Sequence, residues 1–225
     1  MVNSIAKIVQ TIIDDDLPLQ DALRKDYGNY SAIARMIMPK ISDTIGRKVK
    51  LESVITAVKR AKVSYQPQRG DVNKVLANSI INLRTDVAKI SVEKTRNNLK
   101  KVRETVSNFS HDFLNVVEGI SAITLIFDEN LYSEIYSQFN TRDVLDKRQK
   151  LAAVILRSPK DLVTTPGCLL NFVSAISRKG INIEETLSCF TDTIFILNMN
   201  DVSKGFAALT DLVAETRKQG DQRKS

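Results

Sequence analysis

The first part of the chain carries apolar residues at helical spacing. Five isoleucine and valine residues between Ile5 and Ile13 follow the pattern i, i+3, i+4, i+7 and i+8, which predicts a helix with one buried face. A second helix is expected from Pro18, which suits a first helical turn, to about Asp26. Gly28 and the asparagine after it then break the helical pattern.

Two further helices are expected before residue 66. The run "YSAIARMIMPKISDTIG" places four isoleucines four residues apart, and Pro39 should kink or divide this helix because proline lacks a backbone donor. The run "LESVITAVKRAK" turns Leu51, Ile55 and Val58 inward and its basic residues outward. A polar cluster, residues 66–70, then indicates a linker.

After the linker the pattern becomes one of strands and helices, and it occurs twice. Its first copy reads as the strand "DVAKISVE", the helix "NNLKKVRETVSNF", the strands "FLNVVEG" and "ISAITLIFD", and the helix "NLYSEIYSQF". Its second copy reads as "LAAVILR", "CLLNFVSAISRK", "INIEETLSCF", "TDTIFILNM" and "VSKGFAALTDLV". This order, βαββα, is that of a ferredoxin-like unit, and its repetition predicts two such units in tandem.

The sequence therefore predicts an α+β protein. We expect a basic helical module over residues 1–66, a first unit over 75–150, a second unit over 151–216 and a polar tail over 217–225. A ferredoxin-like unit closes with a further strand, for which the segment after Val213 is too polar. Either the strand-like "VLANSIINL" fills an edge, or the two units lend strands to one another.

The positive charge of the chain is concentrated in the helical module. The formal net charge is +7, and residues 40–69 hold eight basic residues against two acidic ones, a net charge of +6. Such a patch is typical of nucleic-acid binding, because phosphate contacts supply most non-specific affinity, although a solvated helical face explains it equally well. The candidate phosphate contacts are Lys48, Lys50, Lys59, Arg60 and Lys62.

Two short helices around Gly28 that precede a basic helix suggest a helix-turn-helix. In the common pattern a small residue lies four positions before the turn glycine, whereas here Ala22 lies six before it. The geometry would therefore have to differ from the common one. The alternative is a helical module that serves packing or dimerisation.

The second repeat resembles a known family. "TPGCLLNFVSAISRKGINIEETLSCFTDTIFIL", with "DVSKGFAAL" after it, is similar to the ACT domains of aspartokinase-type enzymes, in which a Thr-Pro-Gly turn follows the first strand and Gly-Ile-Asn-Ile opens the next. The resemblance covers residues 151–213 almost end to end. It implies an amino-acid-binding regulatory domain that pairs with another copy, and hence a homo-oligomer. The segments "NYSAIAR" and "VITAVKR" are in addition similar to small archaeal ACT-domain proteins.

The resemblance also implies a ligand site shared by two paired domains. The turn after the first strand supplies one wall, and the start of the second strand of a neighbouring domain supplies the other. Glycine lets a ligand approach the backbone, helix-start amides favour a carboxylate, and asparagine both donates and accepts. The alternative is that these residues only shape turns. The candidates are Thr165, Pro166, Gly167, Cys168, Asn182 and Ile183.

The first repeat lacks this turn, since "EKTRNN" stands in its place, so a structural role is expected there. Catalysis is not expected, because the single histidine, His111, has no nucleophile or base pattern around it and no phosphate-binding glycine loop occurs. Cys168 and Cys189 lack metal-ligand spacing, and we expect no metal and no cofactor. No apolar run is long enough to span a membrane, and a cytoplasmic location is expected.

Two functions remain open. One is an amino-acid-responsive transcription regulator, in which the helical module binds DNA and the ACT pair senses the effector and forms the dimer. The other is a non-enzymatic regulatory subunit that docks on a metabolic enzyme, with structural ACT units. These hypotheses differ in salt dependence, because DNA binding weakens steeply as the salt concentration rises.

Overall fold

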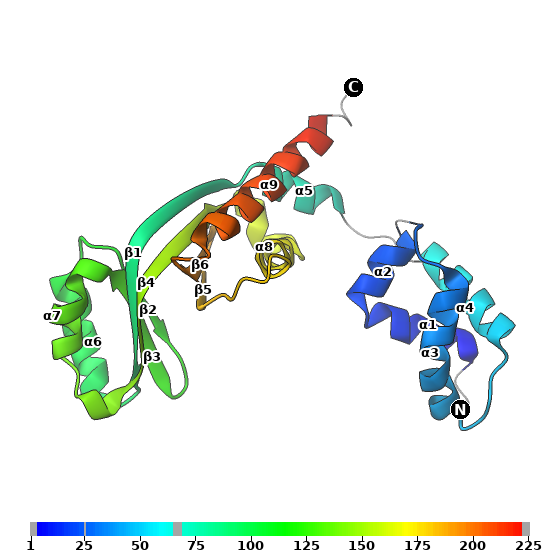
Figure 1. The fold of residues 1–225 in the computed structure, drawn as a ribbon, viewed down its shortest axis with the longest axis horizontal. Helices are drawn as coiled ribbons and strands as arrows, with labels where there is room; N and C mark the ends of the chain where they lie inside the picture. The colour runs from blue at the N-terminus through cyan, green and yellow to red at the C-terminus, as the bar shows by residue number, and fades with distance from the viewer. Residues whose placement is uncertain (1–3, 25, 65–68, 222–225) are drawn as a thin grey trace. The chain divides into compact units, whose positions relative to one another are not determined.

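The computed structural model describes residues 4–24, 26–64 and 69–221, and the chain divides between residues 68 and 69 into two compact units (Figure 1). The helical unit contains α1 (Ile5–Asp14), α2 (Leu17–Arg24), α3 (Tyr30–Ile45) and α4 (Leu51–Ser64). The sheet unit contains all six strands of the described residues. The predicted α+β class is confirmed by this combination of helices and an antiparallel sheet.

The helical unit buries one face of each helix. The sequence defines the helix starts: Ser4 accepts a hydrogen bond from the backbone of Lys7, and Asn29 accepts bonds from the first turn of α3. α4 packs along α1 and α3. The core of this unit consists of Ile8, Val9, Ile12, Ile13, Leu19, Leu23, Ile33, Ala34, Ile37, Ile41, Val54, Ala57, Val58 and Ala61.

Pro39 does not divide α3, which was one of the two effects expected from sequence. The helix is assigned as continuous from Tyr30 to Ile45, with Pro39 exposed inside it. A proline costs the helix the bond that its missing N–H would donate. Ile37 and Ile41, on either side of it, are almost fully buried, so burial of the isoleucine face offsets that loss and holds the helix together.

The sheet unit repeats the predicted order of elements. Its first half contains β1 (Ile80–Glu93), α6 (Arg96–Asn108), β2 (Leu114–Glu118), β3 (Ala122–Asp128) and α7 (Tyr132–Ser137). Its second half contains β4 (Val144–Arg157), α8 (Cys168–Ser177), β5 (Glu185–Cys189), β6 (Asp192–Asn198) and α9 (Val202–Asp221). The helix α5 (Arg69–Ala77) and the short 3-10 helices η1 (Glu129–Leu131), η2 (Thr141–Asp143) and η3 (Lys160–Thr164) connect these elements.

All six strands form one antiparallel sheet in the order β2-β3-β1-β4-β6-β5. β1 and β4 are each 14 residues long and serve both halves. Residues 87–93 of β1 pair with β3, whereas residues 80–84 pair with residues 153–157 of β4. Residues 144–148 of β4 in turn pair with residues 89–92 of β1. Each half therefore obtains its closing strand from the other half, which was one of the two arrangements expected.

Helices cover one face of this sheet. In Figure 1, α6 and α7 lie against the half that contains β2 and β3, and α8 and α9 lie against the half that contains β5 and β6. Ala88 and Ala152 point to these helices and belong to the two helix-covered cores. Their neighbours Val87 and Leu151 point to the opposite face, as alternation along a strand requires, and lie in a third core that joins the halves.

Three segments differ from the expectation. Residues 69 and 70 belong to α5 and not to a linker, while residues 66–68 lie outside the described part. Residues 75–77 of "VLANSIINL" end α5, and the strand begins at Ile80. α9 continues to Asp221, so residues 217–221 of the predicted polar tail are helical. The helix extends because Thr216 is buried and Arg217 donates to the backbone oxygens of Ala77, at 2.6 Å, and Ser79, at 3.2 Å.

Candidate functional site

The Thr-Pro-Gly turn lies between η3 and α8. Gly167 is the N-cap of α8 and has a φ of 94°, a left-handed conformation that glycine adopts without steric cost. Thr165 donates through its hydroxyl to the backbone oxygen of Asp161 at 2.6 Å, and Asn171 donates from its amide to the backbone oxygen of Gly167 at 2.8 Å. The turn is thus held from both sides, and Gly167 is exposed at its tip.

Two of the four turn candidates are open to solvent. Pro166 and Gly167 are exposed, Thr165 is half-buried, and Cys168 is 1% exposed. Burial raises the pKa of the Cys168 thiol, so this residue packs into the core as a neutral thiol. Cys168 therefore fits the structural alternative better than a direct contact with a ligand.

Asn182 and Ile183 lie in the segment between α8 and β5. They were expected in a strand, but β5 begins only at Glu185. Asn182 is exposed and donates to Oε1 of Glu184 at 3.4 Å, while Ile183 packs partly against the core of the second half. The turn precedes α8, a ten-residue helix about 15 Å long, and Asn182 and Ile183 follow it. The two walls of the expected site thus come from segments at opposite ends of this helix.

A buried lysine that the sequence analysis did not identify holds the segment after Asn182. The side chain of Lys89, on β1, is 7% exposed, and its Nζ lies 3.4 Å from Asp146, 3.7 Å from Glu184 and 3.4 Å from Glu185. β1 and β5 are three strands apart in the sheet order, which is about 14 Å in a flat sheet. Contact between them requires the sheet to curl, and Figure 1 shows the curved β1 and β4.

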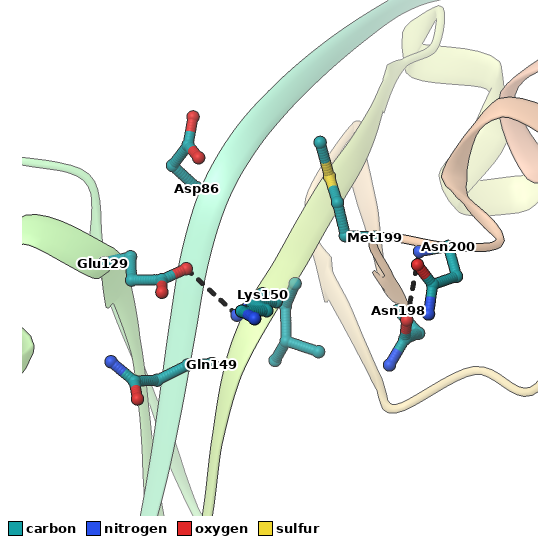
Figure 2. A pocket seen from close by; sticks show the side chains of 8 residues that line it. Asp86, Glu129, Gln149, Lys150, Asn198, Met199 and Asn200 are labelled. Carbon is teal, nitrogen blue, oxygen red and sulfur yellow. Dashed lines mark hydrogen bonds between the residues drawn. The ribbon is translucent and has the colours of Figure 1, made fainter.

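A polar pocket lies beside the middle of the paired strands β1 and β4 (Figure 2). Its volume is about 410 Å³. The pairing of β1 with β4 is irregular at this point, and Asp86 and Lys150 both adopt a φ of 56°. Its walls come from both halves, since Glu129 follows β3 and Met199 follows β6. The lining residues are Asp86, Glu129, Gln149, Lys150, Leu151, Asn198, Met199 and Asn200.

Hydrogen bonds join the walls of this pocket through Lys150. The backbone N–H of Lys150 donates to Oε2 of Glu129 at 3.0 Å, and its backbone oxygen accepts from the N–H of Met199 at 2.9 Å. Figure 2 shows the Glu129 contact and the bond from the N–H of Asn200 to Oδ1 of Asn198, at 3.0 Å. The sequence analysis missed this pocket. The available signal was the polar triplet 84–86 before one apolar strand and the matching triplet 148–150 before the other.

The basic candidates of the helical unit are exposed where they are described. Lys48 and Lys50 lie in the connection before α4, and Lys59 and Arg60 lie on α4. The ammonium of Lys59 lies 5.8 Å from the ring centre of Tyr30, which orients this side chain on the surface. The side chain of Lys62 lies outside the described part of the chain.

The turn between α2 and α3 uses Gly28 and Ala22 in a different spacing from the common helix-turn-helix. The N–H of Gly28 donates to the backbone oxygen of Ala22 at 3.2 Å, and a Cβ on Gly28 would lie 3.1 Å from the side chain of Ile33. Gly28 is therefore at a position where two segments approach closely. Close packing therefore explains why a glycine occupies this position, with or without DNA binding by the unit.

Metal-binding clusters and membrane-spanning helices are absent from the described residues. Within residues 4–24, 26–64 and 69–221, no three histidine, cysteine, aspartate or glutamate side chains gather in a way that could hold a metal ion. None of the helices in these same ranges is long and apolar enough to cross a membrane.

The fold is similar to that of regulatory parts of aspartate kinases. The ligand-free regulatory subunit from Thermus thermophilus matches with a TM-score of 0.50 at 15% identity, over 59% of this chain and 95% of that chain. The regulatory subunit from Thermus flavus matches with a TM-score of 0.50 at 14% identity, again over 59% and 95%. Aspartate kinase from Synechocystis matches with a TM-score of 0.51 at 12% identity, over 61% of this chain but 27% of that enzyme.

These similarities confirm the ACT-type fold that the second repeat predicted. At such low identity they establish the fold and not the activity. No family model matches the chain, and no curated protein matches it. The resemblance to archaeal proteins stays a prediction.

Proposed function

We propose that this protein is a non-enzymatic, amino-acid-responsive regulator of the cytoplasm, in which the sheet unit senses the effector and the helical unit binds DNA. The observation that carries the proposal is the ACT-type sheet unit, which is similar to a regulatory subunit of aspartate kinase over 95% of that subunit's length. A basic helical unit precedes it in the sequence.

The sensor is a pair of ferredoxin-like ACT units that exchange closing strands. Each half has the order βαββα, and residues 80–84 and 144–148 supply the additional strand to the opposite half. β2 and β5 stand at the ends of the sheet order. An end strand offers its unpaired backbone groups to another copy of the chain, which supports a homo-oligomer.

The effector site lies between two copies. The exposed turn at Pro166 and Gly167 forms one wall, and Asn182 of another copy forms the opposite wall. Support comes from the separation of these residues by the full length of α8 in one copy. The free amides at the start of α8 favour a carboxylate, and the amide group of Asn182 can bind an ammonium or carboxylate group.

The DNA-binding surface is the basic stretch from Lys48 to Lys62, along the connection to α4 and α4 itself. Exposed Lys48, Lys50, Lys59 and Arg60 support it. Binding through such residues is electrostatic, so it falls as the salt concentration rises.

The second candidate is a regulatory subunit that docks on a metabolic enzyme. The similarity to a part of Synechocystis aspartate kinase favours it, because in that protein the matching segment is 27% of a whole enzyme. Under this hypothesis the exposed apolar side chains of the helical unit, such as Met36, and not its basic residues, contact the partner.

Two measurements test the proposal. Thermal unfolding of the full chain with each of the twenty amino acids should show a rise in stability with one or a few of them, by mass action. An electrophoretic mobility assay with duplex DNA at low and at physiological salt should show binding that weakens steeply. If no amino acid stabilises the chain, the sensing function is wrong, and if no DNA binds at low salt, the transcription function is wrong and docking is favoured.

A further inference from the structure

The pocket between β1 and β4 is a ligand site separate from the Thr-Pro-Gly turn. We propose that it binds a small zwitterion, a molecule that carries an ammonium and a carboxylate on a short chain. Neither Gly167 nor Asn182 lines this pocket, so the inference does not depend on the effector site proposed above.

The charged groups of the pocket retain atoms that can still bind a ligand. Glu129 uses Oε2 for the backbone of Lys150, and Asp86 uses Oδ2 for the hydroxyl of Thr85 at 2.8 Å, which leaves one oxygen on each carboxylate. Within the described part of the chain, the ammonium of Lys150 makes no ion pair and the carboxamide of Gln149 makes no hydrogen bond. Opposite charges thus share a pocket without neutralising each other.

This arrangement fits a zwitterion better than a simple ion. The free oxygens of Asp86 and Glu129 can accept from an ammonium group, and the ammonium of Lys150 can bind a carboxylate. The three charged groups sum to −1, which disfavours a lone anion, and a lone cation would leave the ammonium of Lys150 without a partner in the pocket. Carboxamides of Asn198 and Asn200 add neutral donors and acceptors.

The size and remaining walls limit the ligand. The volume of about 410 Å³ lies in the lower range of small-molecule sites, which is about 300–1,000 Å³. Met199 and Leu151 provide a small apolar surface, which suits a short aliphatic group. The pocket is therefore large enough for a free amino acid.

Two of the charged lining residues share an uncommon backbone conformation. Asp86 and Lys150 occupy matching positions, directly before the apolar parts of β1 and β4, and both have a φ of 56°. This conformation is uncommon for residues other than glycine, especially for lysine. Since the pocket walls follow β3 in one half and β6 in the other, a bound ligand joins the two halves.

Met199 offers a direct probe of occupancy. It is the only methionine of residues 69–221, whereas Met36 and Met38 lie in the helical unit. The full chain, labelled with carbon-13 at the methionine methyl groups, is titrated with each of the twenty amino acids at millimolar concentration. We expect at least one of them to shift the Met199 resonance saturably and to leave Met36 and Met38 unchanged.

Variants then assign the contacts. Glu129→Gln keeps an oxygen for the N–H of Lys150 but removes the charge, and Lys150→Gln removes the ammonium without adding a methionine. Each substitution should raise the dissociation constant of the amino acid about tenfold or more, because a hydrogen bond to a charged group is lost. Asn182→Ala, at the other proposed site, should leave it unchanged. The N-acetylated and amidated forms of the same amino acid should bind less, because each lacks one of the two charges.

The outcomes separate the two sites. If amino acids stabilise the chain while Met199 does not respond, the pocket proposal is wrong and the turn site stands. The pocket proposal is also wrong if Asn182→Ala abolishes the shift of the Met199 resonance while Glu129→Gln leaves that shift intact. If no amino acid shifts the Met199 resonance and none stabilises the chain, both proposals are wrong. A shift that depends on Glu129 and Lys150, in a chain that keeps its response when Asn182 is changed, supports the pocket.

Discussion

Lys89 on β1 and Glu185 at the start of β5 form an ion pair of 3.4 Å, although they are separated by two intervening strands of the sheet. Asp146 and Glu184 complete the set of carboxylates around the same ammonium group. Lys89 belongs to the first repeat, whereas Glu184 and Glu185 directly follow the candidate residues Asn182 and Ile183 of the second. The first repeat therefore fixes the backbone beside a candidate ligand site of the second repeat.

Removal of Lys89 should destabilise the sheet unit. In Lys89→Met, the alkyl chain keeps its packing, but three carboxylates lose their common counter-charge in a partly buried place. We expect a loss of about 2–4 kcal/mol in the free energy of unfolding, at the low end of the cost of breaking a buried ion pair because the carboxylates are 19–41% exposed. Urea denaturation measures it.

Lys94→Met is the matched control for that variant. Lys94 pairs with Glu118 at 2.8 Å near the surface, with the two side chains 28% and 54% exposed. Exposed pairs contribute little, so the loss should be much smaller than that of Lys89→Met. Equal losses in the two variants would contradict the special role of Lys89.

Gly167→Ala should both destabilise the chain and weaken any amino-acid response. The nearest atom to a new Cβ is Cγ2 of Val72 at 3.9 Å, so space is available and the cost arises from the φ of 94°. We expect a loss of about 1–2 kcal/mol. The same methyl group would stand between a ligand and the backbone of the turn. Chemical denaturation with and without the stabilising amino acid separates the two effects.

Gly180→Ala controls for backbone strain. Gly180 has a φ of 71°, lies after the other end of α8, and leaves open space around the position that a new Cβ would take, with no other atom within 4 Å. The substitution should cost a similar free energy but leave the response to the amino acid intact. If Gly167→Ala retains the full response, the turn does not contact the ligand.

The two thiols should differ in reactivity. Burial raises the pKa of Cys168, whereas Cys189 is exposed at the end of β5. In the folded chain, iodoacetamide should modify Cys189 first and Cys168 more slowly by about tenfold or more, because both access and thiolate content are reduced. Mass spectrometry of the Cys189→Ser and Cys168→Ser variants assigns each rate, and the rates should become similar in urea. Similar rates in the folded chain would show that Cys168 is accessible.

The raised pKa of Cys168 also predicts a pH effect. Folding favours the protonated thiol, so its contribution to stability is complete below the usual thiol pKa of about 8.5 and is lost as the pH rises from there through the raised pKa of the folded chain. The stability of Cys168→Ala should depend less on pH in that window. Denaturation at a series of pH values measures the difference, and identical pH dependence in the two proteins would contradict the assignment.

Lys59→Ala combined with Arg60→Ala should weaken DNA binding uniformly across sequences. If both residues contact phosphates, the slope of log K against log salt should become shallower by about 2. Lys59 also lies over Tyr30, so the circular dichroism of the variant must match that of the parent chain. The control is Arg178→Ala with Lys179→Ala, an adjacent exposed basic pair in the sheet unit. An equal effect of the two double variants would remove the DNA interface from α4.

Local patterns in the sequence determined most of the elements. The helices of the first unit follow from isoleucine and valine at helical spacing, and the repeated βαββα order follows from the alternation of apolar runs with amphipathic ones. These features are local, because the period of a helix or strand and the conformational freedom of Gly167 are properties of a few neighbouring residues. For the same reason the Thr-Pro-Gly turn was found from sequence.

Only the tertiary structure decided how the repeats are joined. That β1 and β4 continue past one half into the other depends on pairing between residues 52 to 77 positions apart, for which no local signal exists. The sequence pattern ended α9 at Val213 because its last turns are polar, whereas Arg217 finds its partners at the end of α5 and in the connection to β1. Lys89 and the pocket at Lys150 were not predicted for the same reason. A charged residue in a strand is expected to face solvent, and only the curled sheet places carboxylates from distant parts of the sequence near these lysines.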